Sequence, residues 1–184
     1  MLTTTFVASI VIGLIRRGSL RRFGDLSLRG LWLVILAFGL QVALRVGGYG
    51  GPLLSGALYA ATYVLLVVFI VLNRSRRELA IMGVGLLSNA LVIWANGGRM
   101  PVSAAAYQAA VGTALPLTDP THIPLTETAR LAWLSDLWAL KPPFPLPGVF
   151  SLGDVVVCLG LFLLVQHVMV RPAAPPPEAH AAKA

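Results

Sequence analysis

Five apolar runs, separated by clusters of charged residues, constrain this chain more than any other feature of its sequence. They cover about residues 1–15, 30–44, 53–72, 79–95 and 155–170. A helix needs about 20 apolar residues to cross the roughly 30 Å hydrocarbon layer of a bilayer, with a tolerated range of about 17–25. Charged residues make up only 11% of the chain, against about 25% in a soluble domain. The sequence therefore predicts an all-α membrane protein with five transmembrane helices. It excludes a cytosolic enzyme, a secreted disulfide scaffold and a disordered chain.

The basic residues predict the orientation of these spans. Lys and Arg accumulate in the short loops on the cytoplasmic side of a membrane. Of the 14 Lys and Arg residues, ten fall on the side of the loops 16–29 and 74–77, and four fall on the other side. Since five spans place the termini on opposite sides, we expect the N-terminus outside and the C-terminus in the cytoplasm.

The same basic loops predict the partners of the chain. A basic loop beside an apolar span is explained by membrane topology, so we expect no nucleic acid as a partner. Anionic lipid headgroups are the natural partners of four arginines in the first loop, namely Arg16, Arg17, Arg21 and Arg22. Another membrane protein remains a possible partner.

The domain organisation is a single transmembrane domain, residues 1–170, followed by an Ala/Pro-rich tail, residues 171–184. The composition of the tail predicts a disordered cytoplasmic segment. Residues 96–150 form the long connection of the chain, and all other loops are short. We expect this connection to be external and partly helical, because long ordered loops often carry function.

Two helices are expected within the long connection. Pro101 and Gly112 are typical of the start and the end of a helix. Leu and Trp residues recur at helical spacing over residues 124–140, which predicts an amphipathic helix in the outer membrane interface or a plug across the outer mouth of the bundle. Residues 141–147 are rich in proline and predict a stiff, extended return to the last span.

Polar residues within the spans are the first candidates for a functional site. Asn89 lies near the middle of the fourth span, where a polar side chain needs a partner. Interhelical hydrogen bonding is one interpretation and contact with a ligand is the other. Gln41 and Arg45 share one face of the second span, four residues apart. Arg45 either snorkels outward, pairs with an external carboxylate, or holds an anionic ligand.

Two short motifs mark the outer ends of the last two spans. The block Asn96-Gly97-Gly98-Arg99-Met100-Pro101 ends the fourth span. Its glycines suit a helix end and also allow close approach of a ligand, while Arg99 faces the negative end of the helix. Ser151-Leu-Gly-Asp154 is a capping-box pattern before the last span. It would place the Asp154 carboxylate at the outer rim, in reach of Arg45 or Arg99.

The histidine of the long connection, His122, completes the candidate set. With Asp119 and Asp136 it would supply three metal ligands, but their spacing matches no established pattern. We therefore predict no metal and no cofactor. General acid–base work is an alternative to a plain surface histidine.

The candidate external polar cluster is Gln41, Arg45, Asn89, Asn96, Gly97, Gly98, Arg99, His122, Asp136 and Asp154. Two further residues, His167 and Cys158, are expected to be a bundle or interface contact and a small buried apolar residue.

The order of these motifs resembles a known family. The features that carry the resemblance are Arg16-Arg17-Gly18, Trp32, Gln41, Ser88-Asn89, the Asn-Gly-Gly-x-Met-Pro block, Leu134-Ser-Asp136 and Ser151-Leu-Gly-Asp154. From about Met1 to Val170 the chain resembles a family of small bacterial integral membrane proteins classed only as a domain of unknown function. The resemblance implies a location in the bacterial cytoplasmic membrane, and it implies no activity.

Three functions remain open from the sequence. The first is an accessory, scaffold or sensor component with an external functional surface. The second is a small transporter or ligand-binding bundle, although the spans carry no central Asp or Glu and no inverted repeat. The third is an enzyme acting on a lipid-linked or outer-leaflet substrate, in which His122 and an aspartate would move protons.

Overall fold

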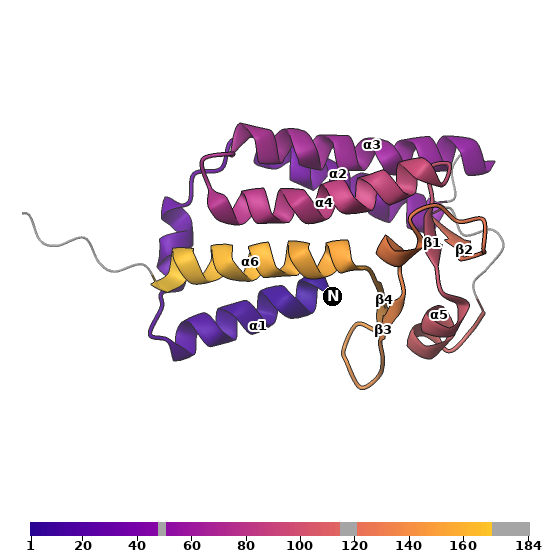
Figure 1. Ribbon diagram of the computed structural model, residues 1–184. Coiled ribbons are helices and arrows are strands. Elements are labelled where there is room, and N and C mark those ends of the chain that lie inside the picture. Colours follow the sequence, from indigo (N-terminus) through magenta and orange to yellow (C-terminus); the bar gives the residue numbers. More distant parts are fainter. Residues whose placement is uncertain (48–50, 115–120, 171–184) are drawn as a thin grey trace, which may run out of the picture.

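The computed structural model describes residues 1–47, 51–114 and 121–170 (Figure 1). Within these residues the chain forms six α-helices, two 3-10 helices and two small two-stranded sheets. The helices are α1 Leu2–Ile15, α2 Leu31–Gly47, α3 Gly51–Leu72, α4 Arg77–Ala95, α5 Ala104–Val111 and α6 Leu152–Val170, with the 3-10 helices η1 Leu20–Asp25 and η2 Ala132–Leu134. The strands are β1 Met100–Val102, β2 His122–Pro124, β3 Trp138–Leu140 and β4 Gly148–Phe150. The predicted disordered tail lies outside the described residues.

Five of the helices lie side by side along a common axis (Figure 1). Helix α6 packs against α1 on one side and α4 on the other, and α4 is followed by α3 and then α2. Each predicted span is therefore a helix. Three of them, α3, α4 and α6, contain 19-residue stretches that are long and apolar enough to cross a membrane. Helices α1 and α2, with 14 and 17 residues, are apolar but shorter. Three helices therefore meet the length of a membrane span, and the predicted total of five spans stays a prediction.

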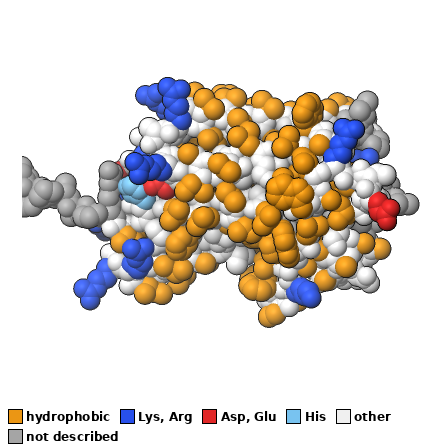
Figure 2. Space-filling view, viewed as in Figure 1, with side chains coloured by type: hydrophobic (Ala, Val, Ile, Leu, Met, Phe, Trp, Pro, Cys, Tyr) orange, Lys and Arg blue, Asp and Glu red, His pale blue; other side chains and the backbone are white. Residues whose placement is uncertain are grey.

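The surface of the bundle fits a membrane protein. Large apolar side chains such as Ile35, Val64, Val84 and Trp94 are exposed along its sides. Figure 2 shows apolar side chains over the flank of the bundle and cationic side chains mainly near its ends. We call the end that carries Arg16 and Arg77 the basic end. An exposed apolar belt of this extent is covered by lipid or by another protein.

Glycines set the close contact between α4 and α6. A Cβ added at Gly160 would meet the Met82 Cγ at 2.5 Å and the Glu78 backbone oxygen at 2.7 Å. A Cβ at Gly153 would clash with the side chain of Asn89. Small residues at such positions let two helix backbones approach, as in other membrane bundles. This approach brings the start of α6 beside Asn89.

The long connection folds over the other end of the bundle, where it forms two small sheets (Figure 1). Strand β1 pairs in parallel with β2, and β3 pairs antiparallel with β4. The predicted first helix is present as α5, and it ends at Gly112 in the left-handed conformation, with φ 82°. It begins at Ala104 rather than at Pro101, because Ser103 accepts a hydrogen bond from the Ala106 N–H as the N-cap and Pro101 lies in β1.

The predicted amphipathic helix over residues 124–140 is wrong. Most of this segment is irregular, with a single short 3-10 helix, η2. The Asn96 side chain binds both the N–H and the carbonyl of Arg130, and Leu131 takes a left-handed backbone, with φ 55°. These tertiary contacts override the helical spacing of the apolar residues. Residues 141–147 are the loop of the β3–β4 hairpin and not an extended return.

Candidate functional site

Strand β1 organises the candidate site. On one edge it pairs with β2, so that Met100 lies opposite His122. On its other edge it holds Asp136, whose N–H donates to the Pro101 carbonyl over 3.0 Å and whose own carbonyl accepts from Ser103 N–H over 3.0 Å. Residues Met100, Pro101 and Val102 are all buried. The strand, which is itself buried in the long connection, therefore holds His122 on one side and Asp136 on the other.

His122 and Asp136 meet across this strand. The His122 Nε2 lies 3.6 Å from the Asp136 Oδ2, and the two side chains are only 11% and 8% exposed. At 3.6 Å the two atoms are too far apart for a hydrogen bond, and they form an ion pair when the imidazole is protonated. The Thr121 Oγ1 lies 2.9 Å from the His122 Nδ1. The imidazole thus sits between a hydroxyl and a carboxylate, an environment suited to proton transfer.

Asp136 carries an unusual feature for a buried carboxylate. Its Oδ1 is buried and has no hydrogen-bond partner among the residues that the structure describes, and the same holds for the neighbouring Ser135 Oγ. Buried polar atoms almost always find a partner, since leaving one unpaired costs about 1–3 kcal/mol. Such unpaired atoms beside a histidine mark a place where another polar group is needed.

A second polar cluster joins α4 to the start of α6. The Asn89 Nδ2 donates to the Asp154 Oδ1 over 2.9 Å, and the Ser151 Oγ donates to the Asn89 Oδ1 over 2.9 Å. The Ser151 N–H donates to the Asp154 Oδ2 over 3.0 Å, while the Asp154 N–H donates to the Ser151 Oγ over 3.1 Å. This is the reciprocal capping box that the sequence predicts. Asn89 is 3% exposed and lies level with the start of α6.

The Asn-Gly-Gly block shapes the backbone. The Asn96 Nδ2 donates to the carbonyls of Val92 over 2.8 Å and Arg130 over 2.9 Å, and its Oδ1 accepts from the Arg130 N–H over 2.9 Å. Gly98 has φ 86°, and a Cβ there would lie 3.0 Å from the Gly56 backbone. The second glycine therefore allows the connection to cross directly over α3.

A cavity of about 450 Å³ opens between the helices and the long connection. Its polar side chains come from five separate parts of the chain: Thr3 of α1, Gln41 of α2, Tyr59 of α3, Thr121 before β2, and Asp154 of α6. Gln41 is oriented by its Nε2, which donates to the Thr62 Oγ1 over 2.8 Å. The remainder of the lining is mainly apolar, with side chains such as Phe38 and Val149. A mostly apolar wall with a few converging polar groups is typical of small-molecule sites.

Thr121 connects the cavity to the histidine. Its side chain lines the cavity and also contacts the His122 ring. Asp154 lines the same cavity. Tyr59 also lines the cavity, and the ring of Tyr63 stands edge-on to it with 5.6 Å between the ring centroids. The two polar clusters thus belong to one site at this end of the bundle.

The predicted residues take different places around this site. Gln41 and Asp154 line the cavity, Asn89 binds Asp154, and His122 contacts Asp136. Asn96, Gly97 and Gly98 shape the connection, and Arg99 is half-buried without lining the cavity. The side chain of Arg45 and the whole of Asp119 lie outside the described residues.

Sequence reasoning missed the tyrosines and threonines of the site. Tyr59, Thr62 and Tyr63 follow one another at positions i, i+3 and i+4 of α3, which places them on one helix face. Their polarity within the most apolar span is the signal that would have found them. Thr121 carries no such signal, since only the pairing of β2 with β1 brings it to the cavity.

Metal ligands do not cluster in the part of the chain that the structure describes. No group of three His, Cys, Asp or Glu side chains there is arranged to hold a metal ion. Cys158 is free and buried on α6. The chemistry of the described site is thus that of carboxylates, an imidazole, amides and hydroxyls.

Apolar helices that carry a polar cavity at one end define a membrane protein with a site beside its long connection. The chain belongs to a family of unknown function, DUF5317, whose model matches residues 25–166. The family resemblance expected from the motifs is thereby confirmed. An uncharacterized protein of Thermotoga maritima is 24% identical over 181 residues, which cover 97% of this chain and 99% of that protein. No solved structure matches the chain.

Proposed function

We propose that the chain is a small sensor-type component of the bacterial cytoplasmic membrane that binds a ligand at its external end. In this proposal all five apolar helices enter the bilayer, the long connection is external, and the basic end faces the cytoplasm. The support is the distribution of charge, since the loops at the basic end, residues 16–29 and 74–77, hold eight of the 14 Lys and Arg residues. The two short helices, α1 and α2, are accommodated by local thinning of the bilayer and by snorkelling arginines.

The cavity of about 450 Å³ is the observation that carries the binding function. Its volume falls within the range of about 300–1,000 Å³ typical of ligand sites. Asp154 is the one charged side chain among its described lining residues, and Thr3, Gln41, Tyr59 and Thr121 add an amide and three hydroxyls. This set suits a small molecule with a cationic amine and a compact apolar body. Because the walls come from both the bundle and the connection, an occupant would fix their relative position.

Cysteine labelling in intact cells tests the orientation. In a background with Cys158→Ala, we would introduce Thr113→Cys in the connection or Ser75→Cys at the basic end, both exposed positions. A membrane-impermeant maleimide is expected to label the cysteine at position 113 and not the one at position 75. Labelling of position 75 alone would reverse the proposed orientation.

Thermal unfolding in nanodiscs tests the ligand class. We would measure the Tm of the full chain with choline, putrescine or ethanolamine, and with glycerol as the neutral comparison. At least one amine is expected to raise the Tm of the wild type and to lose this effect in Thr121→Val and Asp154→Asn. Glu127→Gln removes an exposed carboxylate outside the cavity and is the matched control. Equal responses of all variants, or none in the wild type, would contradict the proposal.

General acid–base catalysis on an outer-leaflet substrate is a second candidate function. The observation that favours it is the 3.6 Å approach of the His122 Nε2 to the Asp136 Oδ2. In this function the imidazole would move the proton and Asp136 would orient it. Lipid extracts of cells that express the wild type or His122→Gln would be compared by mass spectrometry, with His180→Gln as the control. A lipid species altered by the wild type and the control but not by His122→Gln would establish catalysis, and identical extracts would exclude it.

A further inference from the structure

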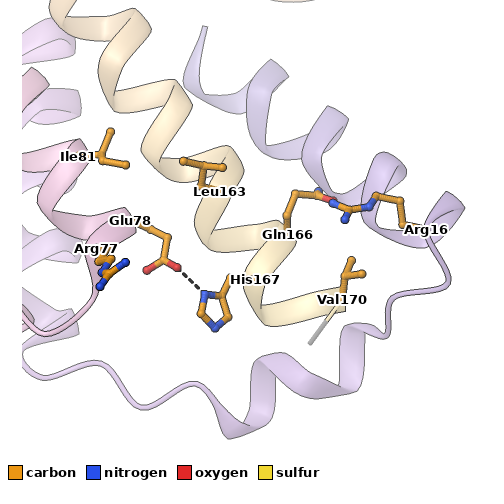
Figure 3. Close-up of a pocket in the computed structure, with 8 residues that line it drawn as sticks. All are labelled: Arg16, Arg77, Glu78, Ile81, Leu163, Gln166, His167 and Val170. Atoms are coloured by element: carbon orange, nitrogen blue, oxygen red, sulfur yellow. Dashed lines mark hydrogen bonds and ion pairs between the residues drawn. The ribbon is translucent and has the colours of Figure 1, made fainter. Parts of the chain in front are cut away.

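We propose that the basic end of the bundle holds an anionic glycerophospholipid in a groove between α1, α4 and α6. This inference is independent of the cavity at the other end. The groove has a volume of about 460 Å³. Arg16 enters it from the end of α1 and Arg77 from the start of α4, with the last turns of α6 between them (Figure 3).

The charges of the groove favour a phosphate. The Arg16 Nη1 donates to the Gln166 Oε1 over 2.9 Å, and the Gln166 Nε2 donates to the Ser9 carbonyl over 2.7 Å. This chain of hydrogen bonds orients the guanidinium without neutralising it, because the amide is uncharged. A guanidinium has five N–H donors, so an oriented arginine retains the capacity to bind a phosphate oxygen.

The acidic residue of the groove, Glu78, is paired with a histidine that lines the same groove. The Glu78 Oε1 lies 2.5 Å from the His167 Nδ1 (Figure 3). Arg77 lies beside this pair in the same view. One carboxylate oxygen is therefore already hydrogen-bonded, and the groove sets two guanidinium groups against a single carboxylate. Electrostatic complementarity then selects an anionic ligand.

Apolar side chains continue the groove away from the charges. Ile81 lies four residues after Arg77, and Leu163 lies four residues before His167, which puts each one turn deeper along its own helix face. On α6 the same face continues through Leu159 and Val155, which are 51% and 42% exposed. This order of a charged end followed by an apolar track matches a headgroup followed by an acyl chain.

The space beyond the arginines suits a headgroup. A second hollow of about 650 Å³ is lined by Ser75, Arg76 and Arg77 together with the Glu78–His167 pair. It adjoins the groove through Arg77, and its lining is polar. A free phosphate would use the cations alone, whereas a glycerophospholipid uses the cations, this hollow and the apolar track together. The structure thus favours the lipid over the free anion.

The groove differs from the lipid contacts expected from the sequence. Arg16 takes part, but its partner is Arg77 from the following basic turn and not Arg17, Arg21 or Arg22. Arg22 instead donates to the Met169 carbonyl over 2.8 Å, where it caps the end of α6. Only the packing of α1 and α4 on α6 brings the two arginines to one groove.

Native mass spectrometry of the full chain with added dioleoylphosphatidylglycerol tests the proposal. The double variant Arg16→Gln/Arg77→Gln is compared with Arg21→Gln/Arg74→Gln, which removes the same charge from the basic end outside the groove. Each arginine is expected to contribute about fivefold to binding. The groove variant should therefore bind the lipid about 25-fold more weakly, while the control retains at least a third of the wild-type affinity.

Two further arms identify the source of the anion. Dioleoylphosphatidylcholine is expected not to occupy the groove, and millimolar inorganic phosphate is expected not to displace the anionic lipid. Equal weakening of both double variants, or displacement by phosphate, would overturn the proposal. If the groove variant does not fold, a photoactivatable phosphatidylglycerol is cross-linked to the wild type. Labelled peptides from residues 77–81 and 159–170 support the site, and labelling confined to other segments refutes it.

Discussion

Substitution of Asn89 by leucine is the most informative test of how the site is held together. Leucine has the same branched shape and is somewhat bulkier, but it lacks both polar atoms. The change breaks the bond from the Asn89 Nδ2 to the Asp154 Oδ1 and the bond from the Ser151 Oγ to the Asn89 Oδ1, each 2.9 Å long. Asp154 keeps the capping bonds within its own turn of α6.

The expected loss follows from these two bonds. Interhelical hydrogen bonds in membrane proteins contribute on average about 0.6 kcal/mol and at most about 1.7 kcal/mol each. Since one of the two involves a carboxylate that then loses a partner, Asn89→Leu should lower the free energy of unfolding by about 2–3 kcal/mol. The measurement is reversible unfolding in mixed micelles, followed by circular dichroism.

The neighbouring serine is a matched control. The Ser88 Oγ is buried and has no hydrogen-bond partner among the described residues. Ser88→Ala on the same helix should therefore leave the free energy of unfolding unchanged within about 0.5 kcal/mol, or raise it. If Asn89→Leu is as stable as the wild type, or if Ser88→Ala is as destabilising as Asn89→Leu, the interhelical role of Asn89 is refuted.

Three further changes test other contacts. Gly153→Ala should lower the free energy of unfolding by about 2 kcal/mol or more, because its Cβ would clash with Asn89; Gly39→Ala, which meets nothing within 4 Å, is the control, and equal stability of the two variants would contradict the packing. Asn96→Ala should speed tryptic cleavage after Arg130, whose backbone loses both clamping bonds, as followed by peptide mapping in nanodiscs. Unchanged cleavage would argue against the clamp. Ser135→Ala removes a buried hydroxyl without a described partner, so its Tm should stay the same or rise, and a fall of several degrees would reveal a partner.

The sequence predicts the helices of the bundle well because their signal is local. Long apolar runs between arginines need no tertiary information, and the observed ends lie close to the predicted ones. The same is true of the capping box, since Ser151 and Asp154 interact within one turn of chain. Gly112 likewise ends α5 through its own backbone conformation.

The long connection was harder to predict because its structure depends on distant contacts. The apolar spacing of residues 124–140 is genuinely helical, yet the clamp from Asn96 and the pairing of β3 with β4 determine the backbone there. The cavity could not be predicted from the sequence for the same reason. Gln41, Tyr59, Thr121 and Asp154 are far apart in the sequence and meet only after the helices have packed. The spacing of residues in the sequence also does not predict the His167–Glu78 pair, which joins α6 to α4.

The central claim is that the cavity at the connection end binds a small cationic molecule. Native mass spectrometry of the full chain, extracted gently from its own membrane, tests this claim most directly. The account predicts a small-molecule adduct of defined mass on the wild type that is absent from Thr121→Val and retained by Glu127→Gln. A wild-type protein without such an adduct, or one that keeps the same adduct after Thr121→Val, would contradict it.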